Sequence, residues 1–561
     1  MPELALAVRQ RADPLDRIAH AGLAVVFVLL LGCLAAPLAT VLAQSVEDRS
    51  GTFVALDNFA SYVQTPALVN SLWNSVWVAA LVTLLTLPAA FLFAYALTRS
   101  CMPLKGVFRT IALTPLLAPS LLAAISFIYW FGNQGVLKGT FASIYGAPGI
   151  IISEIFAVFP HALMILITAL TLADARLYEA ADALGASRAR KFFTITLPGA
   201  KYGLISAALV TFTLVITDFG IPKVIGGNFD VLATDIFKLV IGQQDFQRGA
   251  VVAMFLLAPA LVTFVVDRAV QRKQTSMLSA RAVPYVARKS PGFDAAMTLY
   301  CVAIAALMLA VFGMALYASF VKFWPYDLSF SLRHYRFGLV DAEVNVAFFN
   351  SLKLALGTAI GGTALVFVGA YLLEKTRGAD WLRPGVQLLA LLPMAVPGLV
   401  LGLGYIFFFN APGNPLNVLY HTMTLLVLCT IVHFYTTGHL TALTALKALD
   451  AEFEAVSASL KVPFYRTFWR VTLPICTPAL VDISRYFFIN AMTTISAVVF
   501  LYSPDTKVAS IAILNLDEAG EPGPAAAMAV LIAATSLAAC ILYLGLGWLV
   551  ERNTQKWRTL K

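Results

Sequence analysis

The segment Glu179-Ala-Ala-Asp-Ala-Leu-Gly-Ala-Ser-Arg188, which continues to Thr196-Leu-Pro198, is polar and basic and lies between two long apolar runs. A second such segment, Glu454-Ala-Val-Ser-Ala-Ser-Leu-Lys-Val-Pro463, continues to Arg470-Val-Thr-Leu-Pro474 about 276 residues downstream. We call them the first basic loop (172–198) and the second basic loop (446–474). Because the same kind of segment occurs twice, the sequence predicts two homologous halves, each holding a short helix at a membrane surface.

The composition indicates an integral membrane protein. Of the 561 residues, 60% are hydrophobic and only 12% are charged, which is more apolar surface than a soluble core needs. A transmembrane helix needs about 20 largely apolar residues, and we expect twelve spans, at 20–43, 71–97, 108–131, 148–171, 199–219, 249–268, 295–320, 347–373, 385–409, 418–441, 475–499 and 524–549. The predicted fold class is an all-α membrane protein with about 12 transmembrane helices in two parallel six-helix halves.

The charge pattern divides the chain and orients it. Lys and Arg concentrate in the tails, in a connection between the halves and in both basic loops, which all fall on one face of a twelve-span arrangement. Such a bias marks the cytoplasmic face, so we attribute the net charge of +9 to it and expect no nucleic-acid binding. The expected division is a cytoplasmic tail at 1–19, a first half at 20–271, a cytoplasmic linker at 272–292, a second half at 293–549 and a cytoplasmic tail at 550–561.

The repeat is visible in single residues as well as in hydropathy. Asn74-Ser75 recurs as Asn350-Ser351, 276 residues later, and the Pro-x-x-x-Pro pair that begins at Pro115 recurs from Pro393 at a shift of 278. A register kept over this distance indicates an internal duplication. Because each half has an even number of spans, both basic loops are expected on the same side of the membrane.

The first basic loop carries the signals of a short helix. One face of that helix is predicted to hold small and apolar residues, namely Leu177, Ala180, Ala181 and Leu184. Gly185 is expected to end it, because glycine adopts the left-handed conformation of a helix stop at no steric cost. Pro198 is suited to the first turn of the next helix.

The order Glu-Ala-Ala, then Gly six residues after the Glu, then Leu-Pro near position twenty resembles the coupling-loop signature of the permease subunits of bacterial ATP-binding-cassette importers. In that family the loop forms a helix that docks in a groove on the ATPase subunit. The second copy is irregular, since Leu460 stands where Gly is expected and Glu454 is one residue farther from its Leu-Pro. The resemblance implies that ATPase coupling in this chain involves Glu179, Ala180, Ala181, Gly185, Pro198, Glu454, Ala455 and Pro474.

Two fused six-span halves also resemble the ferric-iron type of importer permease. A similarity to the fused permeases assigned to 2-aminoethylphosphonate uptake covers nearly the whole chain, and it is carried by the stretches 97–103, 217–227, 319–325 and 498–507. The resemblance implies a permease subunit of the bacterial inner membrane with 2-aminoethylphosphonate as cargo and ferric iron as the alternative. Its implied partners are a dimer of ATPase subunits, an extracytoplasmic solute-binding protein and membrane lipids.

No enzyme chemistry is predicted for this chain. A GxxxxGK[ST] phosphate-binding loop is absent from the sequence, so ATP and Mg are expected on a partner ATPase. We expect no catalytic residue, no metal-ligating residue and no cofactor in the chain itself.

Ionisable residues inside apolar spans are costly and mark candidate functional positions. They are Glu154, His161, Asp218, His433, His439, Asp482 and Arg485. Asp482 and Arg485 lie three residues apart on a helix and are expected to pair with each other. The spans that follow the basic loops would move first with them, so Asp218, Asn490 and Thr493 are the predicted lining of a translocation path.

Two further readings fit the hydropathy. A secondary transporter with two parallel halves has the same span pattern, but this reading does not account for the paired basic loops. A membrane scaffold without transport would need the loops to bind some other soluble partner.

Overall fold

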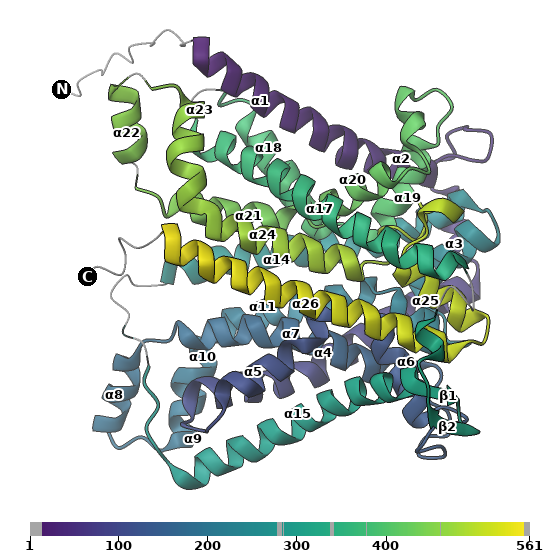
Figure 1. Ribbon diagram of the computed structural model, residues 1–561, viewed down its shortest axis with the longest axis horizontal. Coiled ribbons are helices and arrows are strands. Elements are labelled where there is room, and N and C mark those ends of the chain that lie inside the picture. The colour runs from purple at the N-terminus through teal and green to yellow at the C-terminus, as the bar shows by residue number, and fades with distance from the viewer. Residues whose placement is uncertain are drawn as a thin grey trace.

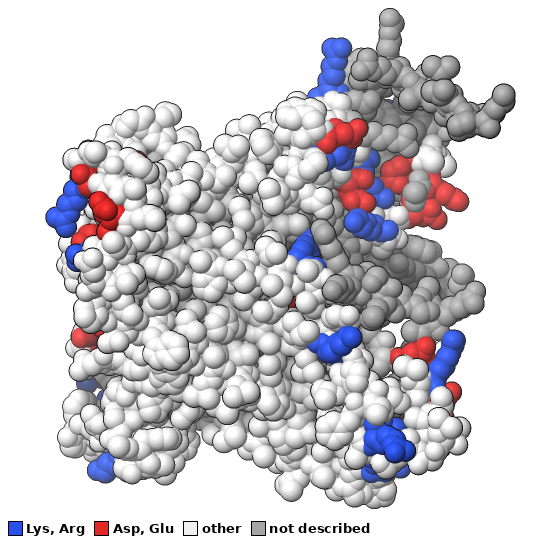
Figure 2. Space-filling model, turned by 180° about the vertical axis from the view of Figure 1, so that it is seen from behind, with Lys and Arg blue, Asp and Glu red and all other residues white. Residues whose placement is uncertain are grey.

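Long apolar helices lie side by side and make up most of this computed structural model (Figure 1). The structure describes residues 14–277, 283, 285–336, 342–376, 379–450, 452–460 and 462–554. Figure 2 shows charged side chains gathered at two opposite ends, with a broad uncharged band between them. This distribution is the one expected for a bundle that crosses a bilayer.

The helices of the first half are α1 (Pro14–Leu30), α2 (Ala36–Ser45), α3 (Asp57–Val63), α4 (Pro66–Arg99), α5 (Lys105–Leu113), α6 (Ser120–Phe131), α7 (Ala147–Thr171), α8 (Ala175–Ala183), α9 (Arg188–Lys191), α10 (Leu197–Gly199), α11 (Lys201–Thr217), α12 (Gly220–Ile225), α13 (Leu232–Phe237) and α14 (Phe246–Met277). The second half contains α15 (Pro291–Phe320), α17 (Ala342–Lys375), α18 (Arg383–Leu391), α19 (Gly398–Phe409), α20 (Met423–His433), α21 (Tyr435–Lys447), α22 (Glu452–Ser459), α23 (Phe464–Thr467), α24 (Leu473–Thr493), α25 (Ala509–Glu518) and α26 (Pro522–Thr554). A short antiparallel hairpin, β1 (Val321–Phe323) and β2 (Asp327–Phe330), follows α15.

Seven described helices are long and apolar enough to cross a membrane, or up to eleven if each bent helix pair forms one span. The prediction of a helical membrane protein is therefore confirmed. Of the twelve expected spans, eleven coincide with these helices and helix pairs, whereas α24, at the eleventh expected span, is not among them.

The third and ninth expected spans, 108–131 and 385–409, are each broken into two helices. The chain bends by 101° between α5 and α6 and by 117° between α18 and α19. Each bend falls on one of the duplicated Pro-x-x-x-Pro pairs, where proline lacks an amide donor and forces the preceding residue into extended backbone. These breaks place non-helical backbone in the interior of the bundle.

The duplicated Asn-Ser pairs hold equivalent segments in the two halves. Asn74 Nδ2 donates to the carbonyl of Asp230 at 3.0 Å, and Asn350 Nδ2 donates to that of Asp505 at 2.8 Å. The adjacent serine accepts a backbone amide at 2.8 Å in both cases, from Leu232 and from Ala509. Because both side chains satisfy backbone groups at or just before the starts of α13 and α25, their recurrence has a structural cause.

The first helix of each half packs against the other half. Helix α1 contacts α17 and α18, and α2 contacts α19, whereas α15 contacts α4, α5 and α6. Tyr300 of α15 donates its hydroxyl hydrogen to the carbonyl of Ala89 in α4 at 2.8 Å. The expected boundary between 271 and 272 falls inside α14, which continues to Met277.

Candidate functional site

The first basic loop forms a helix with a defined start and stop. Asp174 caps α8 by accepting the amide of Arg176 at 3.1 Å. Gly185 ends the helix with φ +67°, as predicted, and the amide of Ala186 donates back to the carbonyl of Ala181 at 2.9 Å. This is the hydrogen-bond pattern of a glycine-terminated helix. Ser187 then caps α9.

The second basic loop repeats this geometry in one register, shifted by 276 residues. The amide of Val462 donates to the carbonyl of Ser457 at 2.8 Å, which is the counterpart of the closing bond in the first loop. Leu460 therefore corresponds to Leu184, so the expectation that it occupies the glycine position is wrong. The position equivalent to Gly185 is 461, which lies outside the described residues.

In this register the acidic residues Glu179 and Glu454 do not occupy equivalent positions in the two loops. Pro198 and Pro474 are equivalent, and each follows a π-helical turn whose last residue is a buried threonine. Counting back from them, Ala455 takes the position of Glu179, and Glu454 precedes it by one residue. Glu454 forms an ion pair with Lys375 at 3.0 Å.

Both loop helices expose apolar side chains. Leu184 is 85% exposed and Leu460 is 69% exposed, and Leu177 and Val456 are also exposed. Glu179, Ala180 and Ala455 are exposed as well, while Ala181 is half-buried. Leu184 and Leu460 are thus exposed at equivalent positions of the two loops.

The two loops lie at one end of the molecule. Figure 1 shows α8 and α22 at the same end as the start of α1 and the end of α26, with the β1–β2 hairpin and α25 at the other. The structure thus places both loops where a single partner assembly on one side of a membrane reaches them.

The chain that joins the halves packs against the first loop. The ring of Tyr285 lies 4.7 Å from that of Tyr178 on α8, and Arg288 forms an ion pair with Asp182 at 3.5 Å. Lys191 of α9 also pairs with Asp182. Hydrogen bonding to Lys191 holds the pKa of Asp182 below its usual range, with a smaller contribution from the positive charge of Arg288.

A cavity of about 300 Å³ opens between the halves. From the first half it is lined by α11, α14 and Asp218, and from the second half by the bend between α18 and α19, the break between α20 and α21, and α24. Its polar side chains are Thr213, Thr217, Asp218, His433, Thr436, Thr437, Tyr486 and Ser496. Among the described lining residues none is Lys or Arg.

Asp218 follows α11 and is fixed by its neighbours. Its Oδ2 accepts the amide of Ile221 at 2.9 Å, and its carboxyl group lies close to the side chains of Ser120 and Glu154. Ser120 begins α6 directly after the proline break. The break therefore contributes to the position of the Asp218 carboxylate on the cavity wall.

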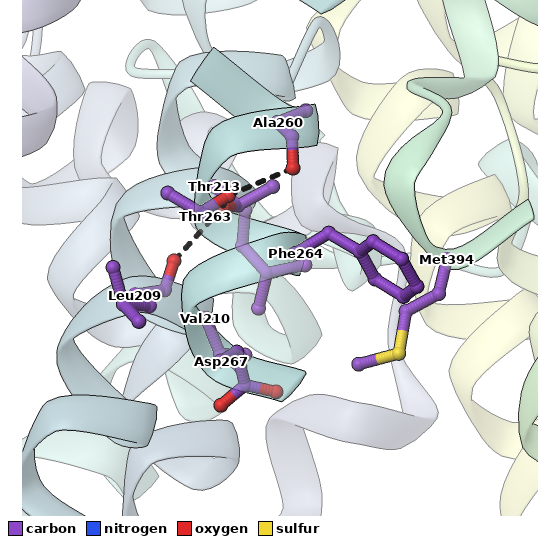
Figure 3. Close-up of a pocket in the computed structure, with 9 residues that line it drawn as sticks. Leu209, Val210, Thr213, Ala260, Thr263, Phe264, Asp267 and Met394 are labelled. Atoms are coloured by element: carbon purple, nitrogen blue, oxygen red, sulfur yellow. Dashed lines mark hydrogen bonds between the residues drawn. The ribbon is translucent and has the colours of Figure 1, made fainter. Parts of the chain in front are cut away.

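A smaller pocket of about 130 Å³ adjoins the cavity and shares Thr213, Leu214, Ala260 and Met394 with it. Figure 3 shows Phe264 of the first half beside Met394 of the second, with Asp267 at one end of the pocket. Thr213 and Thr263 hydrogen-bond to each other at 2.7 Å. The combined space has carboxylates, hydroxyls and apolar groups.

The other predicted path residues lie near the cavity but do not line it. Asn490 donates to the carbonyl of Tyr486 at 2.8 Å, and Thr493 donates to that of Ile489 at 3.0 Å, so both hydrogen-bond within α24. Their place on the path stays a prediction. The expected pair of Asp482 and Arg485 is confirmed at 2.9 Å.

Sequence reasoning missed most of the second half's contribution to the cavity. The residues of the bend from Pro393 to Gly398, together with Thr436 and Tyr486, were not predicted. The duplicated Pro-x-x-x-Pro spacing is the signal that points to the bend. Among the described residues, no three His, Cys, Asp or Glu side chains lie close enough together to hold a metal ion.

Comparison with protein families gives a match in each half. The family described as "Binding-protein-dependent transport system inner membrane component" matches residues 86–277 and again 366–552. Together these matches cover more than half of the chain, and each contains one basic loop.

Several proteins are similar to most of the chain. The ferric transport system permease protein FbpB of Actinobacillus pleuropneumoniae is 28% identical over 513 residues, which cover 86% of this chain and 71% of that protein. A protein of Sinorhizobium fredii named as a probable ABC transporter permease, y4fN, is 24% identical over 95% of this chain and 97% of its own length. A protein of Salmonella typhimurium, named provisionally as the 2-aminoethylphosphonate transport system permease PhnU, is 24% identical over 41% of this chain and 85% of its own length.

Proposed function

Because this chain belongs to the binding-protein-dependent transport system inner membrane component family, we propose that it forms the translocation path of a ferric-iron importer. It is the non-catalytic, multi-pass inner-membrane permease subunit of an ATP-binding-cassette system, in which a partner ATPase binds ATP. The cargo, the docking residues and the orientation of the chain are the proposed parts.

Ferric iron is favoured over 2-aminoethylphosphonate as cargo. The similarity to a ferric permease extends through both halves, whereas the similarity to the phosphonate permease covers 41% of the chain. The central cavity supplies a carboxylate and no Lys or Arg among its described lining residues. Such a wall attracts cations and repels the phosphonate group. The phosphonate remains the second candidate because its amino group is cationic.

The basic loops are the proposed ATPase-docking sites. Their exposed apolar residues lie at one end of the molecule, so a dimeric ATPase has one surface to bind on each half. Glu179, Ala180, Ala181, Gly185 and Pro198 are the proposed docking residues of the first loop, and Glu454, Ala455 and Pro474 those of the second. On this proposal the loops and both termini are cytoplasmic, the solute-binding protein docks at the opposite end, and residues 272–292 link halves that comprise 20–271 and 293–549.

Uptake of radioactive ferric iron by cells that contain or lack this chain tests the cargo. We expect uptake that requires the chain, stops when ATP is depleted and survives collapse of the proton gradient. Iron uptake that is unchanged in cells without the chain, together with loss of growth on 2-aminoethylphosphonate as sole phosphorus source, would show that the cargo is the phosphonate and not iron. Uptake that follows the proton gradient after ATP depletion would identify a secondary transporter.

A further inference from the structure

Two carboxyl groups of the first half meet at the edge of the central cavity. Asp218 lines the cavity, and its carboxyl group lies beside that of Glu154 on α7. Glu154 is 1% exposed, and its Oε1 has no hydrogen-bond partner among the described residues. An acidic side chain buried this deeply in a membrane bundle is costly, which makes it a candidate functional position.

The opposite wall supplies nitrogen and oxygen donors. His433, at the break between α20 and α21, lines the cavity, and its Nδ1 is buried without a partner among the described residues. The phenol of Tyr486 lines the same wall. Carboxylate, phenol and imidazole groups are ligands that suit hard or borderline metal cations.

The fold does not require these carboxyl groups, because the second half builds the equivalent junction without them. At the shift of 276 residues, Thr430 corresponds to Glu154 and Thr494 corresponds to Asp218. Both threonines are buried, and Thr430 donates to the carbonyl of Leu426 in its own helix at 2.7 Å. The acidic pair is therefore a feature of one half only, and it faces a histidine from the other.

We propose that Glu154 and Asp218, with His433 across the cavity, form a transient recognition site for a hard trivalent metal cation on its way through the membrane. This inference rests on the proposed function, since it names a carboxyl group on the cavity wall and the buried one beside it as the groups that attract a cationic cargo. Among the described residues no three such side chains lie close enough together to hold a metal ion, so a passing cation would meet these groups in turn and not within one coordination shell. A cation must leave such a site as readily as it enters.

Threonine stands at the equivalent positions of the second half. Substituting threonine for Glu154 and Asp218 therefore tests this proposal with a side chain that the equivalent junction already accommodates. Glu154→Thr and Asp218→Thr are compared with Asp235→Asn, which changes a buried carboxyl group that does not line the cavity. The complete importer, with its ATPase and binding protein, is reconstituted in vesicles. We expect both threonine variants to lower ferric-iron uptake by about tenfold or more, with ATP hydrolysis retained and the Asp235→Asn variant unchanged.

Terbium(III) titrated into the purified complex provides a readout that does not depend on transport. We expect sensitised terbium luminescence in the wild type and its loss in both threonine variants; the isosteric Glu154→Gln and Asp218→Asn replace any threonine variant that fails to assemble with the ATPase. Wild-type uptake or wild-type terbium binding by the carboxyl-free variants overturns the proposed site. A wild-type complex that binds terbium but imports no iron overturns the cargo assignment and leaves the site supported.

Discussion

The guanidinium group of Arg99 lies over the ring of Tyr285, with its Cζ atom 4.4 Å from the ring centroid. Arg99 ends α4 in the first half, and Tyr285 belongs to the chain that leads into α15 of the second half. The same guanidinium group lies 5.2 Å from the ring of Tyr178 on α8. These contacts tie the first basic loop to the connection between the halves. We therefore expect a displacement of α8 to be transmitted to both halves.

Replacing Tyr285 by Ala should loosen this connection. A partly buried cation–π contact contributes about 1–2 kcal/mol, so we expect trypsin to cleave after Arg288 or Lys289 several-fold faster in the assembled protein. Tyr285→Phe keeps the ring and should be cleaved at the wild-type rate. Equal cleavage of the Ala variant and the wild type would show that the contact does not hold the connection.

Acid should loosen the first basic loop through Asp182. Its pKa is depressed by the hydrogen bond from Lys191, so the stabilisation is present above the usual carboxyl range and is lost as the pH falls through the lowered pKa. We expect the protection of α8 against hydrogen exchange, measured relative to the intrinsic exchange rate at each pH, to fall below about pH 4. In Asp182→Asn this protection should already be low at neutral pH and should not change with pH over this range. A pH-dependent loss of protection of the same size in that variant would assign the effect to another group.

Glu179→Lys should weaken ATPase binding while the protein still inserts in the membrane, because Glu179 is exposed on α8 at the end of the molecule. We expect several-fold less ATPase to co-purify. Glu551→Lys makes the same charge change at the exposed end of α26, outside both loops, and serves as the control. Co-purification of the ATPase at the wild-type level with Glu179→Lys would count against the docking role of the first loop.

The ion pair between Lys375 and Glu454 should stabilise the second loop, because the two side chains are only 9% and 25% exposed. Glu454→Gln leaves Lys375 largely buried without its charge partner, which costs about 1–3 kcal/mol for a partly screened pair. We expect faster proteolysis within 452–474 in this variant. The exchanged pair Lys375→Glu with Glu454→Lys should recover most of the protection, and a double variant as unstable as the single one would exclude the pair as the cause.

The sequence predicted what depends on local chemistry and on repetition. The span positions follow from apolar runs, and the stop at Gly185 follows from the freedom of glycine to take a positive φ. The bends after α5 and α18 were not predicted, although the duplicated prolines were noticed. A proline pair is compatible with a kinked span or with a sharp reversal, and only packing against the rest of the bundle decides between them.

The cavity was the least predictable part of the site. Asp218 stood out because a carboxylate inside an apolar run is costly. Tyr486 and Thr436 come from helices of the other half and resemble ordinary core residues in the sequence. The equivalence of Leu460 with Leu184 likewise emerged from backbone hydrogen bonds, since counting from the acidic residue gives a register that is wrong by one position.

Single cysteines at Leu184 and Leu460, placed in a variant without native cysteines, test the central claim most directly. Membrane vesicles of both orientations are treated with a membrane-impermeant maleimide, with and without the ATPase. The account predicts that both positions react only from the cytoplasmic side and that the bound ATPase protects both. Labelling of the two positions from opposite sides, or of either one from outside the cell, would contradict it.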